Sequence, residues 1–143
     1  MRHATFGLLI ALLYFSPLVA EEISGPVTGT IGPGTYYVTG NISVPIADSL
    51  IIAPGTDLLF NGGCTFAIYG YLEAVGTETD SITFKRRYPA TSWEGIIFYN
   101  CASDDNRLEY CRLDGSGCQA LELNSCSPTI SHCLITNNLA GAG

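Results

Sequence analysis

Short segments of this chain recur along its length, and this internal repeat constrains the fold more than any other feature. Residues 108–113 (LEYCRL) recur as residues 130–135 (ISHCLI), 22 positions later. Residues 96–101 recur as residues 121–126 with an offset of 25. Similarity at a period of roughly 20–30 residues is typical of solenoid proteins, whose strands stack in register while their loops vary in length.

A less regular repeat lies nearer the N-terminus. Residues 40–44 lead to residues 48–52 much as residues 70–74 lead to residues 80–84, each time from a glycine to an Asp-Ser pair. The offsets together predict coils of about 22–25 residues, with two or three short strands each, and roughly five coils in all.

From Glu21 onward no stretch has helical periodicity. Gly and Pro recur every few residues, and the apolar segments are short and rich in β-branched and aromatic side chains. In residues 121–123, we expect the two leucines to face inward and Glu122 to face water. A β-sandwich would not repeat Cys and Leu or Ile at fixed offsets. We expect strands at residues 35–38, 41–44, 50–53, 57–60, 66–69, 71–74, 81–85, 95–99, 107–113, 120–124, 129–131 and 133–136.

The first twenty residues have the layout of a secretory signal peptide. Arg2 precedes an apolar run at residues 6–19, and Ala20 offers a small residue at the expected cleavage point. A membrane anchor is the alternative, but it needs about 20 apolar residues and this run contains Pro17. No later segment is apolar for long enough to span a membrane.

The charge balance is acidic, with 6 Lys and Arg against 13 Asp and Glu and a formal net charge of −7. Loss of Arg2 with the signal peptide would bring the net charge to −8. Such a surface repels phosphate backbones and anionic lipid, so we expect neither nucleic acid nor a membrane surface as a partner.

Four of the six cysteines fall at equivalent positions of the repeat, Cys101 with Cys126 and Cys111 with Cys133. Equivalent positions of stacked coils lie about 4.8 Å apart, which would give two structural ladders. We favour free, stacked thiols that serve as small apolar residues. Disulfides between coils are the alternative, because the same spacing suits a disulfide. Zinc is disfavoured, since there is no CxxC pair and His132 would face away from Cys133.

Residues 34–42 (GTYYVTGNI), 52–60 (IAPGTDLLF), 76–84 (GTETDSITF) and 127–138 (SPTISHCLITNN) resemble secreted bacterial right-handed parallel β-helix proteins of the pectin-lyase-like superfamily. The resemblance implies an all-β, right-handed parallel β-helix that is secreted or at the cell surface. That fold carries lyases, hydrolases, epimerases and adhesins, so it specifies activity weakly.

The expected domain organisation follows from the signal peptide and the repeat. We expect a signal peptide at residues 1–20, an N-terminal lead-in at residues 21–34 and β-helix repeats at residues 35–143. Natural solenoid ends are capped, and no polar cap follows residues 133–136. We therefore expect the repeats to be truncated at the C-terminus of this sequence, as the N-terminal portion of a longer product.

The resemblance to pectin-degrading enzymes makes carboxylates the first candidates for catalysis. Glycoside hydrolysis needs acidic groups about 5–10 Å apart on one face. The adjacent pair Asp104 and Asp105 lies in the longest loop, and the hydrolase signatures GHG and RxK are absent. We expect no catalytic constellation here; Asp104 and Asp105 are a candidate Ca²⁺ site or ordinary turn residues. Arg107 and Arg112, five positions apart on one expected strand, would face opposite sides and form surface salt bridges.

Some of the aromatic side chains are candidates for ligand binding. Tyr69 and Tyr71 share one parity and, with Trp93 and Tyr99, could form an outer stripe that stacks on sugar rings. Core packing accounts for at least half of the aromatics. The expected function is a scaffold and binding module for polysaccharide or for another cell-surface protein. The alternatives are a polysaccharide lyase or glycoside hydrolase with its active site beyond residue 143, and a disulfide-stapled binding domain.

Overall fold

The computed structural model describes residues 19–139, and these residues form an all-β structure without a helix. Nearly all of the expected signal peptide at residues 1–20 lies outside the described residues. Among residues 19–139 there is accordingly no helix with the length and apolar character needed to cross a membrane.

The described residues form fourteen strands, most of them three to six residues long. In chain order they are β1 (Glu21–Pro26), β2 (Gly29–Ile31), β3 (Gly34–Val44), β4 (Ser49–Ile52), β5 (Thr56–Phe60), β6 (Thr65–Ile68), β7 (Tyr71–Val75), β8 (Ile82–Arg86), β9 (Gly95–Tyr99), β10 (Arg107–Glu109), β11 (Cys111–Asp114), β12 (Leu121–Asn124), β13 (Thr129–Ser131) and β14 (Leu134–Thr136).

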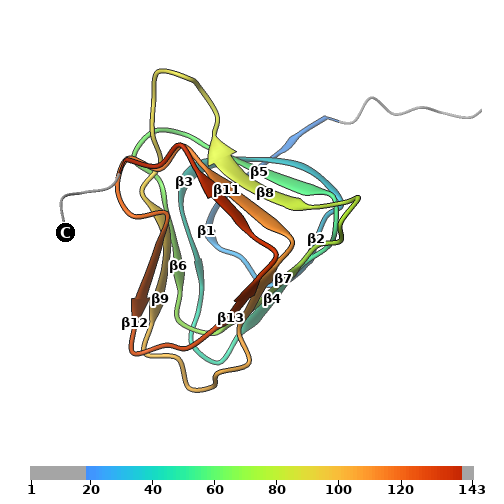
Figure 1. The fold of residues 1–143 in the computed structure, drawn as a ribbon, viewed down its shortest axis with the longest axis vertical. Coiled ribbons are helices and arrows are strands. Elements are labelled where there is room, and N and C mark those ends of the chain that lie inside the picture. Colours follow the sequence, from blue (N-terminus) through green and yellow to red (C-terminus); the bar gives the residue numbers. More distant parts are fainter. Residues whose placement is uncertain (1–18, 140–143) are drawn as a thin grey trace, which may run out of the picture.

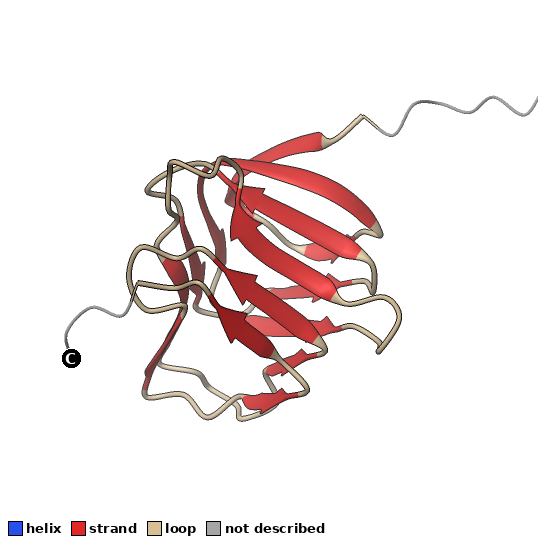
Figure 2. Cartoon of the chain, turned by 45° about the horizontal axis from the view of Figure 1, so that its top comes forward, coloured by secondary structure: helices blue, strands red, loops and turns tan. Residues whose placement is uncertain are grey.

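The strands lie along three sides of a triangular cross-section (Figure 1). Every pairing between them is parallel, and strands of one side stack behind one another (Figure 2). One side carries β13-β10-β7-β4-β2. The other two sides belong to one nine-stranded sheet, because β3 turns a corner and pairs with β5 through its first half and with β6 through its second half.

The two offsets read from the C-terminal part of the sequence are confirmed as strand registers. Ile96 pairs with Leu121 across β9 and β12, an offset of 25. Leu108 pairs with Ile130 across β10 and β13, an offset of 22. Each segment therefore stacks on its counterpart in the next coil.

The N-terminal repeat was aligned wrongly. Residues 40–44 form the last part of β3, which pairs there with β6. Residues 71–74 belong to β7, which pairs with β4. The two segments thus lie on different sides of the triangle. The two segments resemble each other because strands on every side alternate inward apolar and outward polar residues. Alternation alone therefore does not identify the side that a strand joins.

Several strand boundaries also differ from the expected ones. Residues 107–113 form two strands, because Tyr110 adopts a left-handed backbone (φ 49°) and turns the chain onto the next side. His132 has the same conformation (φ 53°) one coil later. The lead-in at residues 21–34 contains β1 and β2, which join the same two sheets as the later strands. The stacked strands therefore begin at Glu21.

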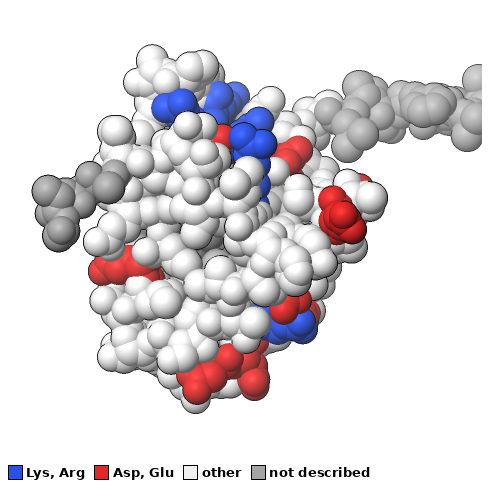
Figure 3. Space-filling view, viewed as in Figure 1, with Lys and Arg blue, Asp and Glu red and all other residues white. Residues whose placement is uncertain are grey.

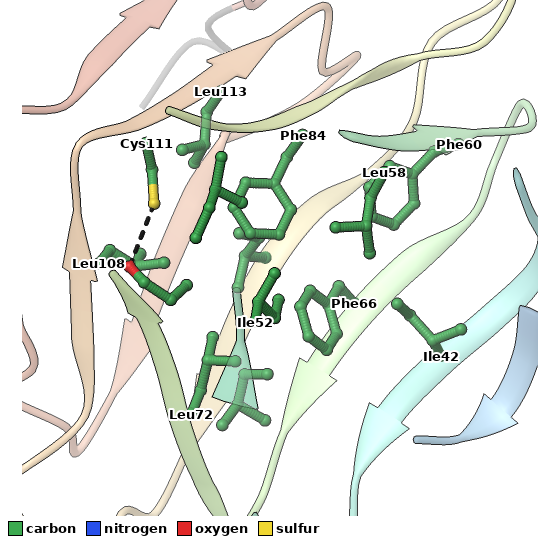
Figure 4. Close-up of a cluster of buried hydrophobic side chains, with 14 of the residues drawn as sticks. Ile42, Ile52, Leu58, Phe60, Phe66, Leu72, Phe84, Leu108, Cys111 and Leu113 are labelled. Atoms are coloured by element: carbon green, nitrogen blue, oxygen red, sulfur yellow. Dashed lines mark hydrogen bonds between the residues drawn. The ribbon is translucent and has the colours of Figure 1, made fainter. Parts of the chain in front are cut away.

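The core is a set of ladders of inward side chains, one from each coil (Figure 4). One ladder contains Tyr36, Leu58, Phe84 and Leu113, which follow one another across β3, β5, β8 and β11. Burying each such side chain contributes about 1.5–3 kcal/mol. Since every rung rests on the one below, the core gains its stability from contacts between coils.

Candidate functional site

A shallow groove of about 370 Å³ lies on the outer surface of β3, β6 and β9. Its floor is made of the outward residues Ser43, Ala67 and Ile97, which are paired in register across the three strands. The small side chains of Ser43 and Ala67 leave space above the sheet. The groove therefore runs across successive coils.

Two stacked tyrosines form one wall of this groove. Ile68 pairs with Phe98, so Tyr69 and Tyr99, the next residues, occupy equivalent positions in successive coils. Their ring centroids are 5.0 Å apart with an interplanar angle of 11°. This separation is close to the strand spacing of about 4.8 Å, so the stack follows from the register. The Tyr69 side chain remains 45% exposed beside the groove.

The opposite wall is polar and uncharged. Asn41 accepts a hydrogen bond at Oδ1 from the backbone N–H of Thr65 (3.0 Å), which fixes the amide beside the threonine hydroxyl. The lining contains no charged side chain: it consists of Asn41, Ile42, Ser43, Thr65, Ala67, Tyr69, Ile97 and Tyr99. Hydroxyl and amide groups beside aromatic surface suit a neutral polyhydroxylated ligand.

Tyr69 also borders a second hollow, of about 230 Å³, which Tyr71 lines from the other side of a corner. The two tyrosines were expected on the same face of the chain. In the structure a turn separates them, because Tyr69 follows β6 and Tyr71 begins β7. Gly70 makes this turn possible, because a Cβ at this position would clash with the carbonyl oxygens of Pro45 and Asp48. The hollow continues the groove around the corner.

Asn106, which the sequence reasoning did not single out, shapes this second hollow. Its side chain is buried, and its Oδ1 accepts a hydrogen bond from the backbone N–H of Leu72 (2.6 Å). Its Nδ2 donates to the carbonyl of Ser103 (3.5 Å). No signal in the sequence distinguishes Asn106 from an ordinary loop asparagine, because its burial is visible only in the structure. Asn106 holds the loop at residues 101–106 against β7.

The acidic pair lies at the far end of this surface. Asp104 and Asp105 are exposed and line a hollow of about 370 Å³ with Tyr71, Arg107 and Thr129. Burial, followed by the charges of Glu73 and Asp105, raises the pKa of Tyr71, while Arg107 lowers it. The structure thus brings Tyr69, Tyr71, Tyr99, Asp104 and Asp105 into one region that crosses a corner of the triangle.

The arginines near this region are paired with carboxylates. Arg107 contacts Glu109 (2.7 Å) and Glu73 (3.8 Å), and Arg112 contacts Asp114 (3.1 Å). The expected reason for their separation, opposite faces of one strand, was wrong, because the corner at Tyr110 places them on different sides of the triangle. Both guanidinium groups are therefore held in ion pairs at the surface.

Asp104 and Asp105 are the candidate Ca²⁺ ligands named from the sequence. Among residues 19–139 no three His, Cys, Asp or Glu side chains gather closely enough to hold a metal ion. Asp104 and Asp105 are exposed loop carboxylates, and a Ca²⁺ site at this pair stays a prediction.

Trp93 does not belong to the aromatic stripe. Its side chain is fully buried, stacks on Phe60 with ring centroids 4.3 Å apart, and donates its indole N–H to the carbonyl of Asp114 (2.9 Å). The expectation that it contacts a sugar was wrong. A large indole ring that can satisfy its N–H inside is more stable in the core.

The expectation of free, stacked thiols was wrong for one of the two cysteine pairs. Cys101 and Cys126 are joined by a disulfide with a Cα–Cα separation of 5.0 Å. The free thiols within residues 19–139 are those of Cys64, Cys111, Cys118 and Cys133. Alternation predicts the equivalence of two positions, and the side-chain rotamers then decide whether the sulfurs bond.

A cationic cluster lies away from the groove, at the end of β8. Figure 3 shows Lys and Arg side chains gathered above the β8 arrowhead of Figure 1. Lys85, Arg86 and Arg87 form this cluster, and the guanidinium of Arg87 lies 3.8 Å from the centroid of the Tyr37 ring. None of these three cations lines the groove.

Comparisons with known proteins leave the family open. No family model matches the chain, and no solved structure matches it. The chain is similar to Protein bark beetle of Drosophila melanogaster, with 37% identity over 67 residues. This match covers 46% of the chain and 2% of the length of that protein.

Proposed function

We propose that this chain is a secreted or cell-surface module with a right-handed parallel β-helix fold that binds neutral polysaccharide in the groove over β3, β6 and β9. The observation that carries the proposal is the uncharged groove with the stacked Tyr69 and Tyr99 in its wall. A groove that runs across three neighbouring strands suits an extended chain of sugars, because it can contact successive sugar units. The parallel pairing of strands on three sides supports the β-helix assignment.

Charge favours a neutral ligand over a uronate polymer. The groove has no cation to pair with carboxylates, and exposed Asp104 and Asp105 lie around the corner from it. Bringing an anionic polymer there would cost electrostatic energy without a compensating salt bridge. The Cys101–Cys126 disulfide supports an extracellular location, since such bonds persist in oxidising compartments.

Affinity electrophoresis tests this function with hydroxyethylcellulose as a neutral probe and polygalacturonate as an acidic one. We expect retardation by the neutral polymer only. Tyr69→Ala should weaken binding about 3- to 10-fold, because an aromatic contact contributes about 0.5–1.5 kcal/mol and 1.4 kcal/mol is tenfold in Kd.

Tyr88→Ala is the matched control, since Tyr88 is 49% exposed and Tyr69 is 45% exposed, but Tyr88 lies outside the groove. It should bind as the wild type does. Retardation by polygalacturonate alone, or equal losses in the two variants, would rule out the groove as a neutral-glycan site.

A further inference from the structure

The two free thiols of Cys111 and Cys133 occupy equivalent positions in successive coils. Cys111 begins β11, and Cys133 directly precedes β14. Because Arg112 pairs with Leu134 in the parallel sheet, the register places Cys111 opposite Cys133. Neighbouring strands lie about 4.8 Å apart, and a disulfide needs a Cα–Cα separation of about 4.4–6.8 Å. Cys101 and Cys126, also one coil apart, meet this requirement at 5.0 Å.

The two side chains also point in the same direction. The Cys111 thiol turns into the interior and donates to the carbonyl of Ala74 (3.3 Å; Figure 4). The Cys133 thiol donates to the carbonyl of Leu108 (3.2 Å), and Leu108 is the residue that pairs with Ala74. Each thiol thus makes the same contact with the coil below.

The environment divides the pair into a reactive and a protected thiol. Cys133 is partly exposed, and the neighbouring Cys111 thiol lowers its pKa to about 6. The neighbouring Cys133 thiol, followed by burial, raises the pKa of Cys111. The thiolate is the nucleophile in disulfide exchange, so Cys133 is the thiol that reacts first.

We infer that Cys111 and Cys133 are a modification site that forms a second disulfide between coils by exchange with a low-molecular-weight disulfide such as oxidised glutathione. The Cys133 thiolate attacks one sulfur of oxidised glutathione, forms a mixed disulfide and releases glutathione thiolate, which takes up a proton. The Cys111 thiol then loses its proton and its sulfur attacks the Cys133 sulfur, which releases the second glutathione. Two protein thiols lose two electrons in total, and one oxidised glutathione becomes two reduced molecules.

The bond would complete a pattern that the first disulfide begins. Cys101–Cys126 links the segments that follow β9 and β12, and Cys111–Cys133 would link β11 to the start of β14. The two bonds lie near different corners of the same coils. Together they would hold the last described coil to the one below from two directions, which should raise the thermal midpoint.

Counting thiols before and after oxidation tests the inference. The folded protein is equilibrated in glutathione buffers of increasing oxidised fraction, denatured in N-ethylmaleimide and weighed by intact mass spectrometry. We expect four adducts under reducing conditions that retain the Cys101–Cys126 bond and two adducts under oxidising conditions. A non-reducing peptide map should contain the linked Cys111 and Cys133 peptides.

Two variants separate this pair from the other free thiols. Cys118→Ser removes an exposed thiol outside the pair, so its count should fall from three to one. Cys133→Ser should remain at three, or carry glutathione as a mixed disulfide without an internal link. Four adducts in the wild type at the most oxidising ratio, or a map that links Cys118 instead, would overturn the inference. If a variant fails to fold, the wild-type peptide map alone still shows whether Cys111 and Cys133 are linked.

Discussion

The middle coils and the last described coil carry the same pattern of inward residues but bury them to different extents. Phe98 of β9 is fully buried, while Leu123, its partner in β12, is 43% exposed. Leu113 of β11 is 1% exposed, while Ile135, its partner in β14, is 49% exposed. No strand of residues 19–139 lies beyond β12 or β14 in the stack. The alternation within a strand thus decides which side chains point inward, and the neighbouring coils decide how much of each inward side chain is buried.

The same contrast extends to chemistry. Cys111 lies between two coils and is buried, whereas Cys133 has a coil on one side and is partly exposed. Their contacts with backbone carbonyls are equivalent, so the difference in exposure follows from position in the stack.

The largest expected difference is between truncations of the two paired residues of β9 and β12. Phe98→Ala should lower the free energy of unfolding by about 3–5 kcal/mol, because it leaves a cavity between coils. Leu123→Ala should cost about 1–2 kcal/mol, since much of this side chain already contacts water. Urea denaturation of both variants measures the difference. Equal losses would mean that another surface covers Leu123 in solution.

A charge in β12 tests which way its residues face. Leu123→Asp should destabilise the chain by about 1–3 kcal/mol, because a carboxylate at the edge of the core is only partly hydrated. Glu122→Lys should stay within about 0.5 kcal/mol of wild type, since Glu122 pairs with outward Ile97. Thermal denaturation followed by circular dichroism compares the two. A greater loss for Glu122→Lys would show that the facing is reversed.

A further expected difference concerns pH and the thiol of the last described coil. The pKa of Cys133 is lowered to about 6 from an ordinary value near 9, so the folded chain releases this proton more readily than the unfolded chain does. Its contribution to stability therefore grows as pH rises from about 6 to about 9, and it is lost as pH falls through 6.

Alkylation measures this shift directly. The rate of iodoacetamide labelling at Cys133 should be half-maximal near pH 6. Cys118, whose pKa is raised by its hydrogen bond to Glu94, should have a midpoint above 9. Cys111→Ala should move the Cys133 midpoint upward, because it removes the neighbouring thiol that is the largest cause of the shift. Coinciding midpoints for Cys133 and Cys118 would contradict the assignment.

Part of the candidate site was predictable from the sequence. Tyr69, Tyr71 and Tyr99 were singled out as surface aromatics, and they do line the groove and its continuation. The stacking of Tyr69 on Tyr99 was not foreseen, although residues 65–69 and 95–99 both end in an apolar residue followed by tyrosine. The intervening loop lengthens the offset to 30, beyond the 22–25 that the other repeats suggested.

Trp93 shows a different limit of the sequence. An aromatic residue in a connecting segment is compatible with a ligand contact or with the core. Its burial depends on Phe60, 33 residues earlier, and on the carbonyl of Asp114. Contacts between coils decide such cases, and no local pattern records them.

By itself the sequence determined the all-β composition, the alternation that faces Phe98 and Leu123 inward, and the register of strands whose loops differ little in length. These follow from local chemistry: side-chain alternation has a period of two residues, and short loops leave few alternatives. Only the tertiary structure decided which side of the triangle each strand joins, how deeply each inward residue is buried, and which cysteines bond. These depend on the coils above and below, because a solenoid is stabilised by contacts between neighbouring repeats.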